Sequence, residues 1–148
     1  MILSGDLPYP YATSPAVSAV MRANRKTGSK PEVEVRRALH RLGYRFRKNL
    51  LIHLAGVAPR PDIVFTRRRL AVFIDGCFWH ACPEHGTVPR VNTDYWLPKL
   101  RRNVTRDRLL DRLLTDSGWR VVRIWEHVEV TQAATIIATM FASQEANQ

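Results

Sequence analysis

Long apolar runs, cysteines and acidic residues are all scarce in this sequence. No apolar run approaches the roughly 18 residues of a membrane-spanning helix, so we expect no membrane segment. The first twenty residues lack the basic start of a signal peptide and contain Asp6 and three prolines, so they are typical of a loose extension in a cytoplasmic protein. In such a reducing compartment, the closely spaced Cys77 and Cys82, with histidines nearby, favour a metal site over a disulfide.

The shortage of acidic residues leaves a strong positive charge. Asp and Glu number 13 against 23 Lys and Arg, and the formal net charge is +10. Most of the excess is arginine, which suits bidentate phosphate contacts, and nucleic acid is a better partner than a membrane surface because the basic residues are scattered. With 148 residues, the chain can bury one core. We therefore expect a monomer with a flexible extension over 1–21 and a single domain over 22–148.

The periodicity of apolar residues predicts the order helix, three strands, helix, strand, helix. The helices are expected over 30–42, from Pro98 to Gly118 and from Thr131 onward; the strands are expected over 44–54, 60–65, 70–75 and 119–127. The basic segment 66–69 fits a tight turn, so strands 60–65 and 70–75 should form a hairpin. This order in a basic chain indicates a small α/β nuclease core.

Two cysteines and two histidines have the spacing of metal ligands. Cys77, Cys82 and His85 follow one apolar strand in the pattern C-x4-C-x2-H, and His127 follows another. Four thiolate or imidazole ligands make a closed, structural zinc site. The alternative is that the cysteines are ordinary small buried residues and the histidines are solvated. If zinc binds, His80 is left over and available for chemistry.

Two aspartates should lie at one edge of the predicted hairpin. Asp62 begins one strand and Asp75 ends the next, so the two carboxylates could hold Mg²⁺ at that edge. Glu32 adds a third carboxylate if the first helix packs across these strands. The alternatives are a turn aspartate after proline, a strand-ending aspartate before glycine, and a capping box between Glu32 and Ser29.

Aromatic residues stand close to the arginines. Phe78 and Trp79 are consecutive, so they cannot both face one core, and Trp96 precedes an arginine-rich helix. Exposed aromatics among arginines suit a protein that stacks on nucleobases or wedges them apart. The alternative, that they are core residues, applies most strongly to Trp96 and Trp125.

Four ordered motifs carry a family resemblance. The segments APRPDIVF, VFIDGCFWHAC, TDYWLPKLRRNVTRD and GWRVVRIWEH resemble motifs of the very-short-patch-repair (Vsr) mismatch endonucleases, and the resemblance runs from about Asn24 to His127. It implies a zinc-bearing variant of the PD-(D/E)xK core of restriction-type endonucleases, with a mixed sheet flanked by helices. It also implies an enzyme that uses Mg²⁺ to nick one strand of duplex DNA at a T·G mismatch, as in repair of deaminated 5-methylcytosine.

The resemblance also assigns roles to residues. Asp62 would be the essential Mg²⁺ ligand, joined by the backbone carbonyl of Ile74. His80 would be the general acid/base. Glu32 would support metal-bound waters. The wedge that enters the duplex would consist of Phe78, Trp79 and Trp96.

This chain departs from the family pattern at three positions. His127 stands where many members have the fourth zinc cysteine, which gives the set Cys77, Cys82, His85 and His127. The lysine of the PD-(D/E)xK pattern falls on Cys77, so histidine chemistry must replace it. The position of Asp75 varies within the family, which leaves open whether it is a metal ligand or a base.

Two other functional classes stay open at this point. One is a related nuclease of restriction or defence type that acts on another lesion or sequence, and the other is a non-catalytic zinc-containing DNA-binding module. The four polar residues Glu32, Asp62, Asp75 and His80 argue against the pure binder. Repair proteins are conceivable partners of the enzyme.

Overall fold

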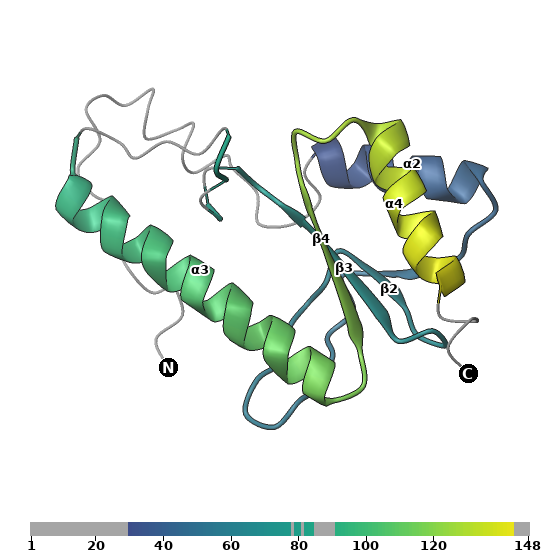
Figure 1. Ribbon diagram of the computed structural model, residues 1–148, viewed down its shortest axis with the longest axis horizontal. Helices are drawn as coiled ribbons and strands as arrows, with labels where there is room; N and C mark the ends of the chain where they lie inside the picture. The colour runs from purple at the N-terminus through teal and green to yellow at the C-terminus, as the bar shows by residue number, and fades with distance from the viewer. Residues whose placement is uncertain (1–29, 78, 81, 85–90, 144–148) are drawn as a thin grey trace.

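A mixed four-stranded sheet between helices forms the centre of the computed structural model, which describes residues 30–77, 79–80, 82–84 and 91–143 (Figure 1). The elements are α2 (Lys30–Arg41), β1 (Arg47–Lys48), β2 (Ile63–Phe65), β3 (Leu70–Asp75), α3 (Thr93–Asp116), β4 (Arg120–Trp125) and α4 (Val130–Ser143). The strand order is β1-β2-β3-β4; the first two pairings are antiparallel and the β3–β4 pairing is parallel. The predicted α/β class and element order are confirmed.

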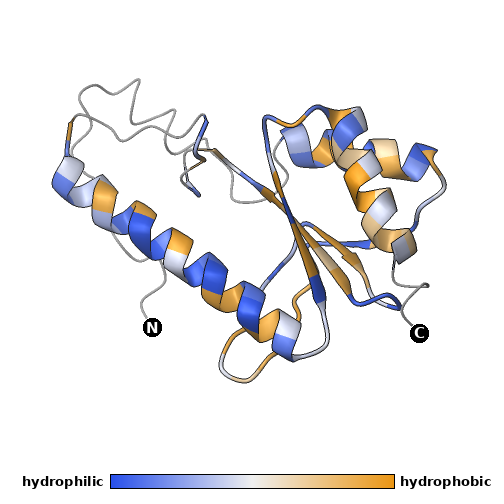
Figure 2. Ribbon diagram, viewed as in Figure 1, coloured by the Kyte–Doolittle hydropathy of each residue, from blue (hydrophilic) through white to orange (hydrophobic). Residues whose placement is uncertain are grey.

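Both faces of the sheet are covered, which explains why β3 is buried along its whole length and apolar from Leu70 to Ile74. Leu70, Val72 and Ile74 pack against α2 and α4, whereas Ala71 and Phe73 pack with Leu114 of α3. Figure 1 shows α2 and α4 together on one side of the strands and α3 on the other. Figure 2 shows the apolar strands in the middle and an α3 in which hydrophilic and hydrophobic residues alternate along the ribbon. Successive residues at the end of β3 therefore face different helices.

α2 begins and ends almost as the sequence predicts. Val35, Ala38 and Leu39 form its buried stripe, and the helix stops at Arg41 because Gly43 adopts a left-handed conformation with φ 96°. The N–H of Tyr44 then donates to the carbonyl of Leu39 at 3.0 Å and closes the helix end. This helix places its first turn over the end of the β2–β3 hairpin.

Two sequence-based boundaries are wrong. The first strand was expected over 44–54, but only Arg47–Lys48 pairs with β2; Asn49 has φ 52°, which turns the chain away from the sheet. The long helix begins at Thr93, not at Pro98. Proline lacks an N–H, but one buried stripe runs through both sides of Pro98, and its packing outweighs the lost hydrogen bond. That stripe contains Trp96, Lys99, Leu100 and Asn103.

The remaining predicted elements are present, although β2 begins at Ile63 and not at Arg60, so Asp62 lies just before the strand that it was expected to begin. β2 and β3 form the expected hairpin around a turn that contains Arg69 at φ 48°. β4 lies within the predicted 119–127 segment, and α4 begins one residue before Thr131. Within the described residues, no helix combines the length and apolar character needed to cross a membrane.

Candidate active site

Asp62 sits at the point where the β2–β3 ladder ends. Its N–H donates to the carbonyl of Val72 at 2.9 Å, and its carboxylate Oδ2 accepts a hydrogen bond from the N–H of Ile74 at 2.6 Å. The side chain thus replaces the backbone partner that a longer β2 would supply to Ile74. This contact fixes the Asp62 carboxylate against β3, and it involves the amide of Ile74, the residue whose carbonyl was expected to bind Mg²⁺.

Glu32 on α2 meets Asp62 in the interior. Glu32 is 4% exposed and Asp62 8%, and Arg36 pairs with Glu32 Oε2 at 2.9 Å. Burial, and next the adjacent Glu32 carboxylate, raise the pKa of Asp62 to about 7. Two adjacent buried carboxylates favour a bound cation, because a divalent ion would stabilise both in their ionised form. The structure therefore brings Glu32 and Asp62 together; Ser29, the alternative capping partner, lies outside the described residues.

A second polar group lies on the α3 side of β3. His80 Nδ1 is in hydrogen-bond contact with Asp107 Oδ2, and His80 Nε2 lies 3.8 Å from Asp75 Oδ1. Arg123 Nη1 donates to both Asp75 oxygens at 3.2 Å. We call Asp75, His80, Asp107 and Arg123 the histidine cluster.

The electrostatics of the histidine cluster favour a charged imidazole. Burial acts to lower the pKa of His80, but the hydrogen bond with Asp107 and the charge of Asp75 outweigh it, so the net shift is upward. Burial also raises the pKa of Asp75, against the opposing effects of His80 and Arg123. A protonated His80 can donate a proton to an oxygen, and its neutral form can accept one.

The two predicted aspartates have different partners. Both lie at the same end of the hairpin, as expected, but Asp62 contacts Glu32 on α2 whereas Asp75 contacts the α3 side. Among the described residues, the acid–histidine group whose ligand atoms lie within 4.8 Å of one another is Asp75, His80 and Asp107; Asp62 stands outside it. The hairpin edge therefore carries two acidic groups with the end of β3 between them.

Three of the four predicted zinc ligands converge. Cys77 Sγ lies 3.2 Å and Cys82 Sγ 3.8 Å from His127 Nδ1. In a tetrahedral site, a sulfur and a nitrogen on one zinc ion are about 3.6 Å apart, so these positions fit the group. Glu84 approaches the other ring nitrogen of His127 at 3.3 Å, the usual outer partner of a zinc-bound histidine. His85 lies outside the described residues.

An aromatic patch, which we define as Trp79, Tyr95 and Trp96, adjoins the histidine cluster. The rings of Trp79 and Trp96 are 5.8 Å apart, and Tyr95 meets Trp96 edge-on at 5.0 Å. Lys99 Nζ lies 5.6 Å from the Trp79 ring centre. Trp79 is partly exposed whereas Trp96 is 1% exposed, so in this conformation Trp96 is the buried ring against which Trp79 packs. Phe78 lies outside the described residues.

Three contacting residues were not assigned a role from the sequence. Asp107 orients His80, Arg123 joins the cluster from β4, and Asn103 Nδ2 donates to the carbonyl of Trp79 at 3.0 Å. Asn103 and Asp107 are four residues apart on α3, so they lie on one helix face. Their spacing of four within the motif TDYWLPKLRRNVTRD was the sequence signal that could have identified Asn103 and Asp107 as site residues.

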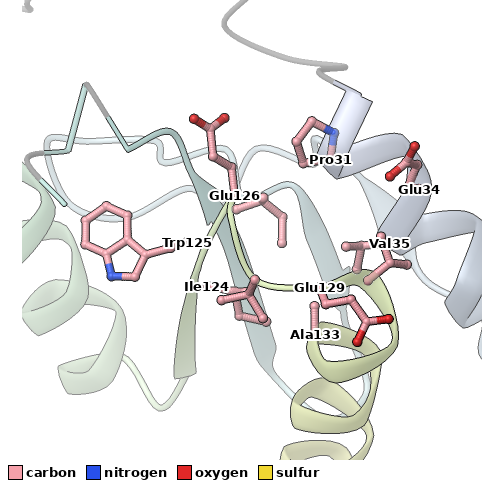
Figure 3. Close-up of a pocket in the computed structure, with 11 residues that line it drawn as sticks. Pro31, Glu34, Val35, Ile124, Trp125, Glu126, Glu129 and Ala133 are labelled. Carbon is pink, nitrogen blue, oxygen red and sulfur yellow. The ribbon is translucent and has the colours of Figure 1, made fainter. Parts of the chain in front are cut away.

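Two pockets flank the end of β3. One, of about 180 Å³, is lined by histidine-cluster residues together with Val104, Arg108, Asp111 and Trp125. The other, of about 230 Å³, lies between α2, the ends of β3 and β4, and α4, and Figure 3 shows Glu34, Glu126 and Glu129 around it. Glu126 Oε1 accepts a hydrogen bond from the N–H of Cys77 at 3.1 Å, which ties this pocket's rim to the cysteine loop.

Comparison with known proteins identifies the family. The family model described as DNA mismatch endonuclease Vsr matches residues 12–84. The chain is 54% identical over 134 residues to the type II nicking enzyme V.NaeI of Lentzea aerocolonigenes, covering 89% of this chain and 81% of that protein. It is 41% identical over 109 residues to the type II nicking enzyme V.XorIIP of Xanthomonas oryzae pv. oryzae, covering 72% and 76%.

A third relative carries the family's own name. The DNA mismatch endonuclease Vsr of Escherichia coli is 41% identical over 76 residues, covering 49% of this chain and 47% of that protein. The extent of the first match, and the agreement of all these relatives on DNA cleavage, settle the class of protein. The chain belongs to the Vsr family and is a DNA endonuclease.

Proposed function

We propose that this endonuclease nicks one strand of duplex DNA at a T·G mismatch, the product of 5-methylcytosine deamination, by Mg²⁺-dependent hydrolysis. The observation that carries the proposal is the adjacency of Trp79 and His80. One belongs to the aromatic patch and the next residue to the histidine cluster, and Asn103 and Asp107 hold them from the same face of α3. A base-contacting surface and a proton-transferring group are thus joined by a single peptide bond.

The residues around Asp62 suit a catalytic Mg²⁺. Asp62 and Glu32 would supply carboxylate oxygens, directly or through water, and the carbonyl of Ile74 is the proposed second ligand. When bound, Mg²⁺ would polarise the phosphodiester and neutralise the charge that develops on it. The raised pKa of Asp62, which is due first to burial and next to the adjacent Glu32 carboxylate, supports this assignment, because a bound cation would favour the ionised form of both carboxylates.

His80 is the proposed proton carrier. The Asp107 carboxylate accepts the Nδ1–H of His80, which leaves Nε2 as the nitrogen that faces reactants and Asp75. Nε2 can take a proton from the attacking water or give one to the leaving oxygen. Asp75 contacts His80 and Arg123 among the described residues, so we assign it to the support of His80 and not to the Mg²⁺ site.

The aromatic patch is the proposed mismatch sensor. Trp79, together with Phe78, would enter the duplex beside the mispair, because a mispaired step costs less to unstack than a paired one. Trp96 would complete the wedge from beneath Trp79, and a direct contact with DNA would require the patch to open. The surrounding arginines would bind phosphates without sequence preference.

Zinc would fix the loop that carries these groups. Cys77, Cys82 and His127 have suitable distances, and His85 is the proposed fourth ligand. A closed zinc site after β3 would hold Trp79 and His80 at a set distance from the sheet. The proposed enzyme has a PD-(D/E)xK core in a single domain over 22–148, which follows an extension over 1–21. We further propose that it is a monomer, acts in the cytoplasm and works with repair proteins as partners.

The second candidate is an endonuclease of the restriction or defence type. It is favoured by the names of the V.NaeI and V.XorIIP relatives as type II nicking enzymes. A nicking assay with end-labelled duplexes that carry each possible mismatch, in Mg²⁺ and in chelator, separates the two. Mg²⁺-dependent cleavage of one strand at T·G alone supports the proposal, and cleavage of a fully paired duplex or of another lesion supports the alternative.

A further inference from the structure

Arg123 binds three carboxylates in the middle of the fold. Its Nη1 lies 3.2 Å from both Asp75 oxygens and 3.7 Å from Asp107 Oδ1. Its Nε lies 2.8 and 3.0 Å from the two Asp111 oxygens, and its guanidinium carbon lies 4.2 Å from the centre of the Phe73 ring. The side chain is 19% exposed. These contacts with three carboxylates and one ring fix the orientation of the guanidinium.

The partners of Arg123 come from three elements. Asp75 and Phe73 are on β3, Asp107 and Asp111 are on α3, and Arg123 itself is on β4. Phe73 is the parallel Cα partner of Arg123 in the sheet, and Asp75 is two residues further on the same face of β3. Arg123 therefore joins the strand that supplies Asp75 to the helix that supplies Asp107.

Every carboxylate oxygen of Asp75 and Asp107 already faces a nitrogen. Arg123 Nη1 lies near both oxygens of Asp75 and near Oδ1 of Asp107, and His80 contacts Oδ2 of Asp107. Asp75, His80 and Asp107 otherwise have the spacing of metal ligands. Mg²⁺ needs oxygen ligands at about 2.0–2.1 Å in an octahedral arrangement, which requires those oxygens to turn toward one ion. The guanidinium already contacts three of these four oxygens, so they are committed to it and not to an ion.

We propose that Arg123 is a built-in cation of the histidine cluster, a positioning residue that holds Asp75 and Asp107 around His80 and takes the place of a divalent ion there. The proposal rests on the function proposed above, in which His80 moves the proton. It assigns the divalent ion of the reaction to the Asp62 and Glu32 group alone. Arg123 suits this role because a guanidinium stays charged and donates in a fixed plane to several carboxylates at once.

The test counts metal ions and does not depend on DNA cleavage. Mn²⁺ is titrated into the full-length protein and the bound fraction is followed by electron paramagnetic resonance. We expect about one Mn²⁺ per chain for the wild type and a second for Arg123→Met, because three carboxylates then lose the guanidinium that they share. Arg120→Met, which removes an arginine from the other end of β4, is the matched control and should keep the wild-type count.

Two results would overturn the proposal: a second Mn²⁺ site in the wild type, or an unchanged count in a folded Arg123→Met. If Arg123→Met does not fold, Arg123→Lys tests the proposal, since lysine keeps the positive charge but lacks the planar set of N–H donors of the guanidinium. Arg123→Lys should bind the wild-type number of ions and nick with kcat about 10²-fold lower at unchanged KM, as expected for a displaced catalytic group. A second Mn²⁺ in Arg123→Lys, or a loss confined to KM, would contradict it. Failure of the wild type to nick T·G duplexes would instead refute the proposed function and leave these counts interpretable.

Discussion

His80 and Asp107, 27 positions apart in the sequence, are in direct hydrogen-bond contact through Nδ1 and Oδ2. Replacing Asp107 by Asn should lower the single-turnover nicking rate by about 10²–10⁴-fold, because the amide neither selects the Nδ1–H tautomer nor stabilises the imidazolium. His80→Ala should cause a similar loss, and the double variant should be little worse than either single one. Asp116→Asn, an exposed change at the end of the same helix, is the control. Additive losses would mean that the two residues act separately.

Asp62→Asn tests the metal ligand while it preserves the local structure. The asparagine oxygen can still accept the hydrogen bond from the N–H of Ile74, so the hairpin end should remain intact. We expect DNA binding, measured by gel shift in Ca²⁺, to stay near the wild-type level while nicking falls by several orders of magnitude. Asp94→Asn, an exposed acid in the first turn of α3, should leave both unchanged. Near-normal nicking by Asp62→Asn would refute the assignment.

The raised pKa of Asp62 predicts how stability depends on pH without divalent ions. The folded carboxyl titrates at about 7, above its ordinary 3.8, so between these values the folded chain holds a proton that the unfolded chain releases. The free energy of unfolding should therefore fall as pH rises from about 4 to 7, with a contribution of at most ~1.4 kcal/mol per pH unit from this one proton. Asp62→Asn should lack this contribution. Urea titrations of both proteins across this range, in Mg²⁺-free buffer, measure the difference; parallel profiles would contradict the prediction.

Metal analysis tests the cysteine loop. The purified protein should contain about one zinc per chain, and His127→Ala should lose the metal together with much of its stability, because a structural zinc site contributes directly to folding. His127→Cys supplies another zinc ligand and should restore both. His53→Ala, an exposed histidine remote in sequence from these ligands, is the control. A stable wild type without zinc would refute the zinc site.

Trp79 should govern discrimination between mismatched and paired DNA. Stacking on a base is worth about 1–3 kcal/mol, so Trp79→Ala should lower the ratio of T·G to paired-duplex nicking by roughly 5- to 150-fold. Trp79→Phe retains a stacking ring and should recover part of the ratio. The fluorescence of 2-aminopurine placed beside the mismatch reports unstacking directly. An unchanged ratio for Trp79→Ala would show that mismatch recognition lies elsewhere.

Local patterns predicted most of the fold. The buried stripe of α2, the β2–β3 hairpin and α4 follow from periodicity, turns and apolar composition within short stretches. The start of α3 was missed because Pro98 reads locally as a helix start, whereas the burial of Trp96 extends the helix back to Thr93. Tertiary packing decides such boundaries, and a single sequence does not display it.

In the candidate site, too, short-range relationships could be predicted from the sequence, whereas contacts that depend on tertiary packing could not. Residues that adjoin in the sequence, such as Asp75 and His80, could be grouped from spacing. The position of Glu32 over Asp62 could be anticipated only as a condition on helix packing, and the structure meets that condition. Asp107 and Arg123 were unassigned because their roles depend on which face of α3 meets the parallel β3–β4 pair. The sheet topology sets which face of α3 meets these strands, and a single sequence does not show it.

A comparison of two nicking rates shows whether this endonuclease recognises the T·G mismatch. Single-turnover nicking is measured on two duplexes of identical sequence that differ at one base pair, T·G in one and C·G in the other, with saturating enzyme and Mg²⁺. We expect one strand of the T·G duplex to be cleaved at least about 10²-fold faster than the paired duplex, because opening a mispair saves a few kcal/mol of unstacking and unpairing. Equal rates on the two duplexes, or cleavage of both strands, would contradict it.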